Sequence, residues 1–182
     1  HLSLRRQRQM CIRDSCYIDL DHFKPYNDVY GYRKGDDMLR LTGKILSGHC
    51  DPQKDFVGHI GGDDFIILFQ SEDWEQRCRA IIDAFVAAVP DFYCTEDRKR
   101  GGYISEDRRG KQVFHTLATI SLGLVKVEPG HYGSHHQIAA ATADAKKQAK
   151  KIPGNSLFID RRQGPYAMEK QNDDDAAQEL VA

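Results

Sequence analysis

The sequence predicts an α+β domain in which a mixed β-sheet carries helices. Three observations lead to this prediction. Strand-like segments alternate with helical ones, two of the strands are joined as a tight hairpin, and 40% of the 182 residues are hydrophobic, enough to fill one core. Because the alternating order favours parallel strands and a hairpin requires antiparallel ones, the sheet should contain both.

The first half of the chain contains a strand, a helix and the hairpin. Residues 1–15 are polar and rich in arginine, and we set them aside as an unassigned, foreign-looking segment. We expect a strand over 16–20, then a short unassigned segment, 22–30, then a helix over 34–48. Two runs of β-branched and aromatic residues flank a Gly-Gly-Asp-Asp turn and predict the hairpin over 56–69.

A helix over 73–89 is the clearest element of the second half. Its apolar residues recur at three and four positions, and Pro90 ends the pattern. The segment 95–112 is dense in mixed charge and glycine. That composition favours a solvated loop over a phosphate-binding or partner-binding segment.

The last part of the chain returns to the alternating order. We expect a strand over 113–127, a helix over 137–151 that Pro153 and Gly154 stop, and a short strand over 157–159. Residues 163–182 are polar and acidic and predict a disordered tail. No repeat or linker divides 16–162, so one domain is predicted.

Composition excludes several classes of protein. A net charge of −1 argues against a generally basic nucleic-acid surface, and no apolar run approaches the roughly 18 residues of a membrane span. The five cysteines form no Cys-x-x-Cys pair and no disulfide framework. A soluble protein of the reducing cytoplasm fits these features best.

The Gly-Gly-Asp-Asp turn is the first candidate site. Gly61 and Gly62 leave the backbone open to phosphates, and Asp63 and Asp64 offer carboxylates for a divalent cation. The same four residues are also ordinary hairpin chemistry, and alone they do not separate a site from a structural turn.

Asp19, at the end of the first predicted strand, favours a ligand site over a structural turn. If this strand lies beside the hairpin, Asp19 and Asp63, with the carbonyl of Leu20, could hold one or two Mg²⁺ (or Mn²⁺) ions. Mg²⁺ is usually held by one or two carboxylates and by substrate phosphates, so the site predicts a nucleoside triphosphate.

Three polar residues near Asp19 could contact such a nucleotide. Lys24 is a candidate phosphate cation, and Asn27 with Asp36 offers the donors and acceptors that read a guanine edge. In isolation an Asn-Asp or Gly-Asp pair is more often a helix cap or a turn.

The order of these motifs resembles the GGDEF family of diguanylate cyclases. Two stretches carry the resemblance, which runs over about 16–159: Gly61-Gly62-Asp63-Asp64-Phe65 and, before it, Asp19-Leu20-Asp21-His22-Phe23-Lys24-x-x-Asn27-Asp28-x-x-Gly31-x-x-x-Gly35-Asp36. The resemblance implies a nucleotidyl-cyclase or polymerase palm-like fold over 16–162. It also implies a homodimer that condenses two GTP into cyclic di-GMP and two pyrophosphates.

The resemblance assigns roles by position. Asp19, the Leu20 carbonyl and Asp63 would bind the metal ion, and Asp64 would help to deprotonate the attacking 3′-hydroxyl. The remaining residues would bind the substrate. Asn27 and Asp36 would bind guanine. The phosphates would contact the backbone at His22, Phe23, Gly61 and Gly62 and the side chains of Lys24 and Lys150. Ser121-Leu122-Gly123 resembles the family's Ser-x-Gly strand.

The sequence also departs from the family pattern. Asp64 replaces a glutamate and is shorter by one methylene, about 1.5 Å of reach. His59 and Gly154 stand where arginines are usual, and Pro52 replaces the arginine of the Arg-x-x-Asp product-inhibition motif that ends at Asp55.

The end of the domain is similar to GGDEF domains that follow EAL phosphodiesterase and CBS domains in longer proteins. The stretch concerned is 145–156, and it implies that this chain is a fragment with such domains upstream. An alternative function is therefore a catalytically weak or inactive GTP-binding domain that controls an attached phosphodiesterase. A purely structural dimerisation domain is a third possibility.

Overall fold

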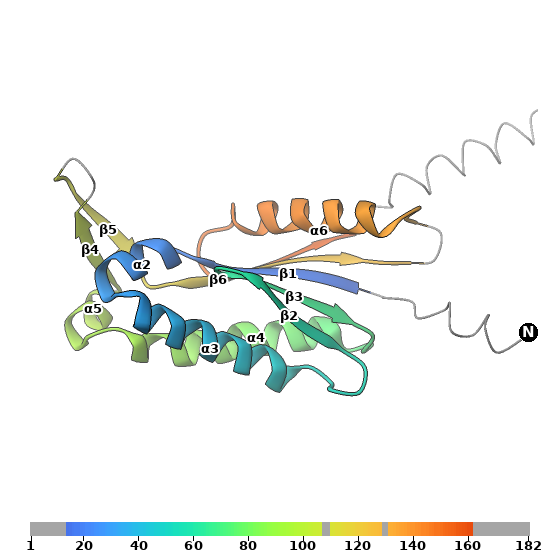
Figure 1. Cartoon of the computed structure of the whole chain (residues 1–182), viewed down its shortest axis with the longest axis horizontal. Helices are drawn as coiled ribbons and strands as arrows, with labels where there is room; N and C mark the ends of the chain where they lie inside the picture. The colour runs from blue at the N-terminus through green and yellow to red at the C-terminus, as the bar shows by residue number, and fades with distance from the viewer. Residues whose placement is uncertain (1–13, 107–109, 129–130, 162–182) are drawn as a thin grey trace, which may run out of the picture.

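The computed structural model describes residues 14–106, 110–128 and 131–161. The predicted tail, 163–182, and most of the segment set aside at the N-terminus lie outside the described residues. The described chain forms a five-stranded mixed sheet with helices on both faces (Figure 1). The prediction of an α+β domain built on a mixed sheet is confirmed.

The first strand lies at the centre of the sheet. β1 (Asp14–Asp21) pairs antiparallel with β3 (Asp64–Phe69) on one side and with β6 (Thr119–Lys126) on the other. β2 (Phe56–Gly61) forms one edge, and β7 (Ser156–Asp160) forms the other, parallel to β6. The predicted hairpin is thus β2 and β3, and it lies beside the first strand as the metal-site hypothesis required.

Helices cover the two faces of this sheet. α3 (Tyr32–His49) and α4 (Trp74–Ala88) lie on one face, and α6 (His135–Ala149) lies on the other (Figure 1). The apolar stripe predicted for α4 is buried, with Cys78, Ile81 and Phe85 fully inaccessible to solvent. Full burial of a side chain such as Ile81 or Phe85 contributes about 1.5–3 kcal/mol to stability.

α6 approaches the sheet unusually closely at Gly123 of β6. A Cβ atom at this position would lie 2.1 Å from the backbone nitrogen of Lys146. No side chain fits between the two backbones, so glycine is required here for α6 to lie directly on the strand.

The prediction of a loop over 95–112 is wrong. This segment contains α5 (Thr95–Arg100), and β4 (Gly102–Glu106) pairs with β5 (Gln112–Thr116) as a separate two-stranded sheet. Tyr103 is 1% exposed although charged residues surround it in the sequence. Composition averaged over the segment concealed a short alternation of inward and outward side chains, which is the signal of a strand.

Other boundaries also differ from the predictions. β1 begins at Asp14, so Asp14 and Ser15, the last two residues of the segment 1–15, are buried strand residues. The unassigned segment after β1 is a helix, α2 (Phe23–Tyr30), and the strand expected over 113–127 is divided into β5 and β6. A short 3-10 helix, Val89–Phe92, follows α4.

Candidate functional site

The carboxylates of the candidate site meet where β1 ends beside the hairpin turn. The β1–β3 register ends with Asp19 opposite Asp64, one residue before Leu20, whose side chain is buried. Gly61 and Gly62 have φ angles of 149° and 58°, conformations that favour glycine, and both are exposed. The turn therefore places Asp63 and Asp64 beside Asp19, next to the solvent-exposed backbone of Gly61 and Gly62.

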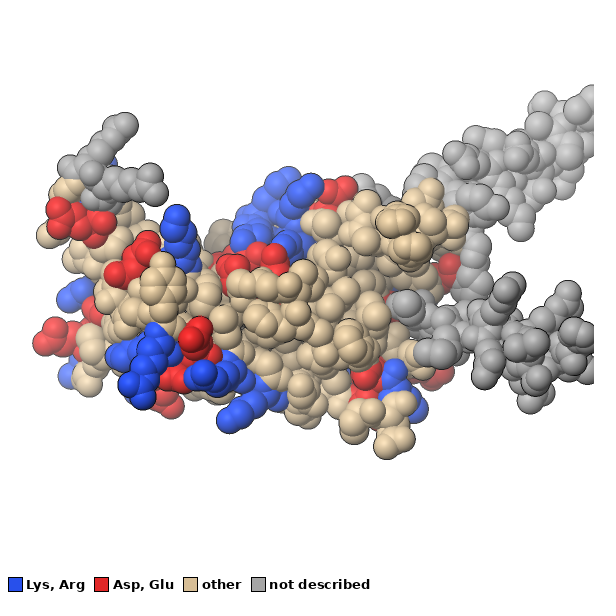
Figure 2. Space-filling view, viewed as in Figure 1, with Lys and Arg blue, Asp and Glu red and all other residues tan. Residues whose placement is uncertain are grey.

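Two lysines at the end of α6, Lys146 in its last turn and Lys150 directly after it, bind these carboxylates. Lys146 Nζ lies 2.5 Å from Asp64 Oδ1 and 3.5 Å from Asp19 Oδ2. Lys150, one helical turn later, donates a hydrogen bond to Asp19 and lies 3.7 Å from Asp21 Oδ1. Side chains of both signs gather where the end of α6 overlies the sheet (Figure 2).

The electrostatics of the cluster favour a bound cation. Burial raises the pKa of Asp63, and the negative charges of Asp19 and Asp64 raise it further. Burial on its own would lower the pKa of Lys146 and of Lys150, but their ion pairs outweigh it and raise both values. The two lysines are therefore protonated at neutral pH, and Asp63 remains a partly buried carboxylate beside two other carboxylates.

The carboxylate of Asp21 is held by the neighbouring strand. Ser121 Oγ donates to Asp21 Oδ2 at 2.6 Å, and Thr119 Oγ1 donates to the same oxygen at 3.1 Å. Two hydroxyl donors and Lys150 satisfy this carboxylate. Asp21 thus anchors the end of β1 to β6, directly before the turn into α2.

The turn between β1 and α2 has a strained backbone. Among the described residues, His22 is the one residue other than glycine with a positive φ, 62°. Its carbonyl accepts a hydrogen bond from Tyr103 Oη at 3.4 Å, so the β4–β5 hairpin contacts this turn. Phe23 is 7% exposed and anchors the start of α2, while Lys24 is exposed.

The expected guanine-binding residues lie on consecutive helices. Asn27 Oδ1 is buried and has no hydrogen-bond partner within the described part of the chain. It lies against Gly35, where a Cβ atom would be 1.8 Å away, and Asp36 follows as an exposed residue of α3. A buried oxygen without a donor costs stability and suits a ligand that brings one.

Two residues near the hairpin have structural roles: His59, where the family usually has arginine, and Asp55, the retained aspartate of the product-inhibition motif. His59 Nε2 donates to the Gly62 carbonyl at 2.8 Å, and its ring stacks on Phe65 at 4.6 Å, so it braces the turn. Asp55 accepts hydrogen bonds from the backbone of Asp51, Gln70 and Ser71 and from the Ser71 hydroxyl. It fastens the base of the hairpin.

Sequence reasoning missed two contributors to the site, Lys146 and the hydroxyl partners of Asp21. Lys146 precedes Lys150 by four residues, a spacing that places both on one helix face, so a signal was present. No sequence signal pointed from Ser121 to Asp21, because their contact depends on the register of two strands 100 residues apart.

Within the described residues, no three or more histidine, cysteine or acidic side chains form a ready metal site. None of the described helices has the length and apolar character that a membrane span requires.

Comparison with known proteins places these features in a family. Residues 3–105, more than half of the chain, match the sequence model of "Diguanylate cyclase, GGDEF domain". The diguanylate cyclase DgcP of Pseudomonas aeruginosa is 36% identical over 72 residues, which are 40% of this chain and 10% of DgcP. A diguanylate cyclase of Vibrio cholerae is 37% identical over 66 residues, 36% of this chain and 19% of that protein. The chain thus spans at most about a fifth of these relatives.

The fold agrees with the sequence match. The crystal structure of the GGDEF domain of DgcB from Caulobacter crescentus, in complex with c-di-GMP, superimposes with a TM-score of 0.58 and 20% identity, covering 86% of this chain and 84% of that one. Likeness at this identity concerns the fold alone. From the family match, together with the Gly-Gly-Asp-Asp turn beside Asp19, it follows that the chain belongs to the diguanylate cyclase GGDEF domain family.

Proposed function

We propose that this chain is a diguanylate cyclase domain that condenses two GTP molecules into cyclic di-GMP and two pyrophosphates. The observation that carries the proposal is the cluster of Asp19, Asp63 and Asp64 under two lysines, where β1 meets the hairpin turn. In each half-reaction a 3′-oxygen forms a bond to the α-phosphorus of the other GTP. The bond to pyrophosphate breaks, and the hydroxyl proton leaves to a base.

Asp19, the Leu20 carbonyl and Asp63 would hold a divalent cation, Mg²⁺ or Mn²⁺. Their chemistry fits, because hard cations prefer oxygen ligands and because Asp63 is a partly buried carboxylate beside Asp19 and Asp64, whose burial and like-charged neighbours raise its pKa. Such a cation stabilises the charge that develops on the reacting phosphates.

The remaining residues would bind and orient GTP. Asn27 and Asp36 would receive guanine, with the buried Asn27 Oδ1 accepting a hydrogen bond from the base. Phosphate oxygens would meet the backbone amides at His22 and Phe23 and the exposed backbone of the glycine turn. Lys24 and Lys150 would neutralise the phosphate charge.

Asp64 would take the proton of the attacking hydroxyl. Because one chain would hold one GTP, the attacking and receiving nucleotides come from two chains that face each other, and the active form would be a homodimer. We place this reaction in the cytoplasm, and in a longer protein with EAL and CBS domains upstream, a proposal that the similarity of 145–156 to such domains supports.

The direct test is incubation of the purified chain with GTP and Mg²⁺, or Mn²⁺, at high protein concentration, with cyclic di-GMP quantified by chromatography and mass spectrometry. The unaltered chain should form product, and Asp63→Asn should form none. Asp144→Asn, which changes an exposed carboxylate on the outer side of α6, should leave product formation unchanged. No product from the unaltered chain would contradict the proposal.

A second candidate is a GTP-binding regulatory domain that makes no product and controls an attached phosphodiesterase. The short Asp64 side chain, occupied by Lys146, favours it. It predicts calorimetric GTP binding that Asn27→Ala abolishes in a chain without turnover. A purely structural dimerisation domain would bind no GTP at all.

A further inference from the structure

Lys146 lies between two carboxylates that the proposed reaction needs for other purposes. Its ammonium group is 2.5 Å from Asp64, the proposed base, and 3.5 Å from Asp19, a proposed metal ligand. The side chain is only 19% exposed, whereas its neighbour Lys147 is 70% exposed and pairs with Asp144. Lys146 is thus directed into the site and Lys147 is directed away from it.

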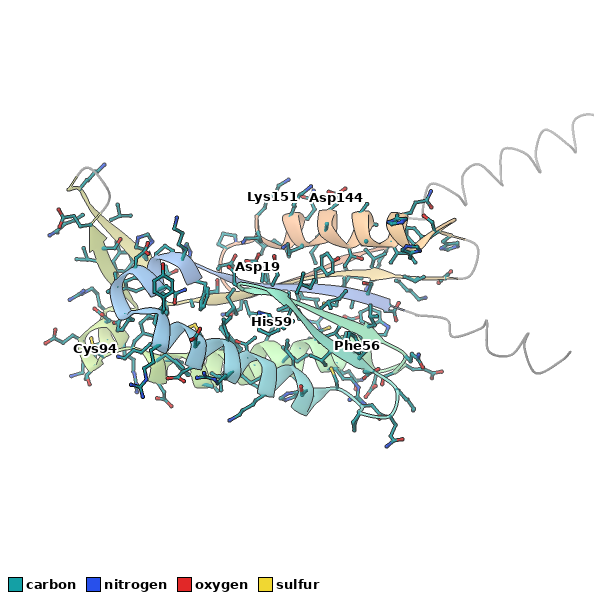
Figure 3. The ribbon with its side chains drawn as sticks, in the orientation of Figure 1. Asp19, Phe56, His59, Cys94, Asp144 and Lys151 are labelled. Atoms are coloured by element: carbon teal, nitrogen blue, oxygen red, sulfur yellow. The ribbon has the colours of Figure 1, made fainter. Side chains whose placement is uncertain are left out.

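The fold holds Lys146 in this position. The backbone nitrogen of Lys146 packs against Gly123, where no Cβ atom would fit, so the helix lies directly on the strand at this residue. Figure 3 shows Asp19 on the face of the sheet that α6 covers, with Asp144 and Lys151 projecting from the far side of the helix. A half-buried ammonium group needs anionic partners, and Asp19 and Asp64 are those partners.

We propose that Lys146 is an internal counter-cation that pairs with Asp64 and competes with the divalent metal ion for Asp19 until nucleotide phosphates give it another partner. The inference rests on the metal site of the proposed function. A divalent ion beside Asp19 would lie close to a fixed positive charge, and like charges in a partly buried site repel strongly. Phosphate oxygens are a strong alternative partner for an ammonium group, so GTP would draw Lys146 from the carboxylates and admit the metal ion with it.

If GTP must draw Lys146 away before the metal ion binds, the chain without nucleotide should bind metal ions differently from the chain with nucleotide. Without nucleotide the site should bind metal ions weakly, because one positive charge already lies between the two carboxylates. Removal of that charge should strengthen metal binding in the absence of GTP, and the gain should shrink when nucleotide is present.

The experiment measures binding of Mn²⁺ alone to the full chain, by electron paramagnetic resonance of the free ion. Lys146→Met should bind Mn²⁺ about tenfold more tightly than the unaltered chain, the order expected when one partly screened unit charge is removed. Lys147→Met is the matched control and should show the unaltered affinity. Lys146→Arg keeps the charge and should also bind weakly.

Two further variants locate the effect and guard against misfolding. Asp63→Asn added to Lys146→Met should remove the gain, because the ion would lose a ligand at this site. Thermal unfolding of each variant shows whether it folds, and Lys146→Gln replaces Lys146→Met if the latter does not.

An unchanged Mn²⁺ affinity in a folded Lys146→Met or Lys146→Gln variant would overturn the inference. So would an equal gain in Lys147→Met, which would indicate a general charge effect. The readout does not depend on turnover. A chain that makes no cyclic di-GMP but shows the specific Lys146 effect would refute the proposed reaction and keep this inference. A chain that makes cyclic di-GMP but shows no Lys146 effect would refute this inference and keep the proposed reaction.

Discussion

Asp64 is held by Lys146 in this structure and would have to receive a proton in the proposed reaction. Its carboxylate is one methylene closer to the backbone than that of glutamate, about 1.5 Å less reach. A base that falls short of the attacking hydroxyl by this distance loses much of its effect. At the scale of single residues, the length of this side chain therefore limits the expected rate.

Asp64→Glu should raise the rate of cyclic di-GMP formation about tenfold to a hundredfold, since a misplacement near 1 Å costs about that much. The measurement is initial rate at saturating GTP. Asp64→Asn should be inactive in the same assay. A slower Asp64→Glu variant would mean that the site has adapted to the shorter side chain.

Asp55 stabilises the hairpin, because its carboxylate accepts hydrogen bonds from the backbone at both ends of it. Partial burial alone would raise its pKa, but the hydrogen bonds it accepts from Asp51, Gln70 and Ser71 outweigh this and lower the pKa below the ordinary value of 3.8. The ionised carboxylate therefore stabilises the folded chain above that pH. This contribution is lost as the pH falls through the lowered pKa of the folded state.

Asp55→Asn should lower the free energy of unfolding by about 1–3 kcal/mol at pH 7, the usual cost of losing hydrogen bonds to a charged group. The difference from the unaltered chain should shrink as the pH drops below about 4, where Asp55 itself becomes protonated. Urea unfolding at several pH values measures both effects. Asp144→Asn, an exposed control, should change stability little, and a pH-independent loss for Asp55→Asn would contradict the prediction.

At the scale of elements, α6 and β6 act as one unit because Gly123 lets their backbones touch. This contact sets the height of α6 above the sheet and therefore how far Lys146 and Lys150 reach. The β4–β5 hairpin helps to position the turn between β1 and α2, since buried Tyr103 of this hairpin contacts the turn at His22. The positions of site residues thus depend on packing between whole elements.

Gly123→Ala should destabilise the chain by about 1–3 kcal/mol, because the added methyl group overpacks the contact with α6. It should also lower GTP turnover, since α6 carries Lys146 and ends directly before Lys150. The control is Gly48→Ala in α3, where a Cβ atom meets nothing within 4 Å and alanine should stabilise the helix slightly. Thermal unfolding distinguishes the two, and equal melting temperatures would show that α6 can shift without cost.

At the scale of the whole molecule, the described chain forms one core around a five-stranded sheet, and the proposed site lies where the central strand β1 of that sheet ends. A single chain supplies one set of guanine-binding and metal-binding candidates. Under the proposed function, joining two GTP molecules would therefore require a second chain.

The rate of cyclic di-GMP formation per chain should rise with chain concentration and level off once dimers predominate. A dilution series assayed at constant GTP, with sedimentation on the same samples, measures the rate and the dimer fraction together. A rate per chain that stays constant while the dimer dissociates would show that one chain suffices.

Sequence patterns alone determined the order of the main elements, the hairpin and the neighbourhood of Asp19 and the Gly-Gly-Asp-Asp turn. These features depend on local properties, namely the period of apolar residues and the backbone freedom of two glycines. They also led to the GGDEF family. The α5 and β4–β5 segment was predicted wrongly, because its strands are short and only one buried tyrosine interrupts the charge.

Only the tertiary structure decided what the acidic residues touch. Lys146 and Asp64 are 82 residues apart, and Lys150 and Asp19 are 131 apart, so their contacts follow from the close approach of α6 to the sheet. The buried oxygen of Asn27 likewise depends on how α2 packs against α3 at Gly35. Local sequence carries no record of such distances, since they are set by the packing of elements that the chain brings together only when it folds.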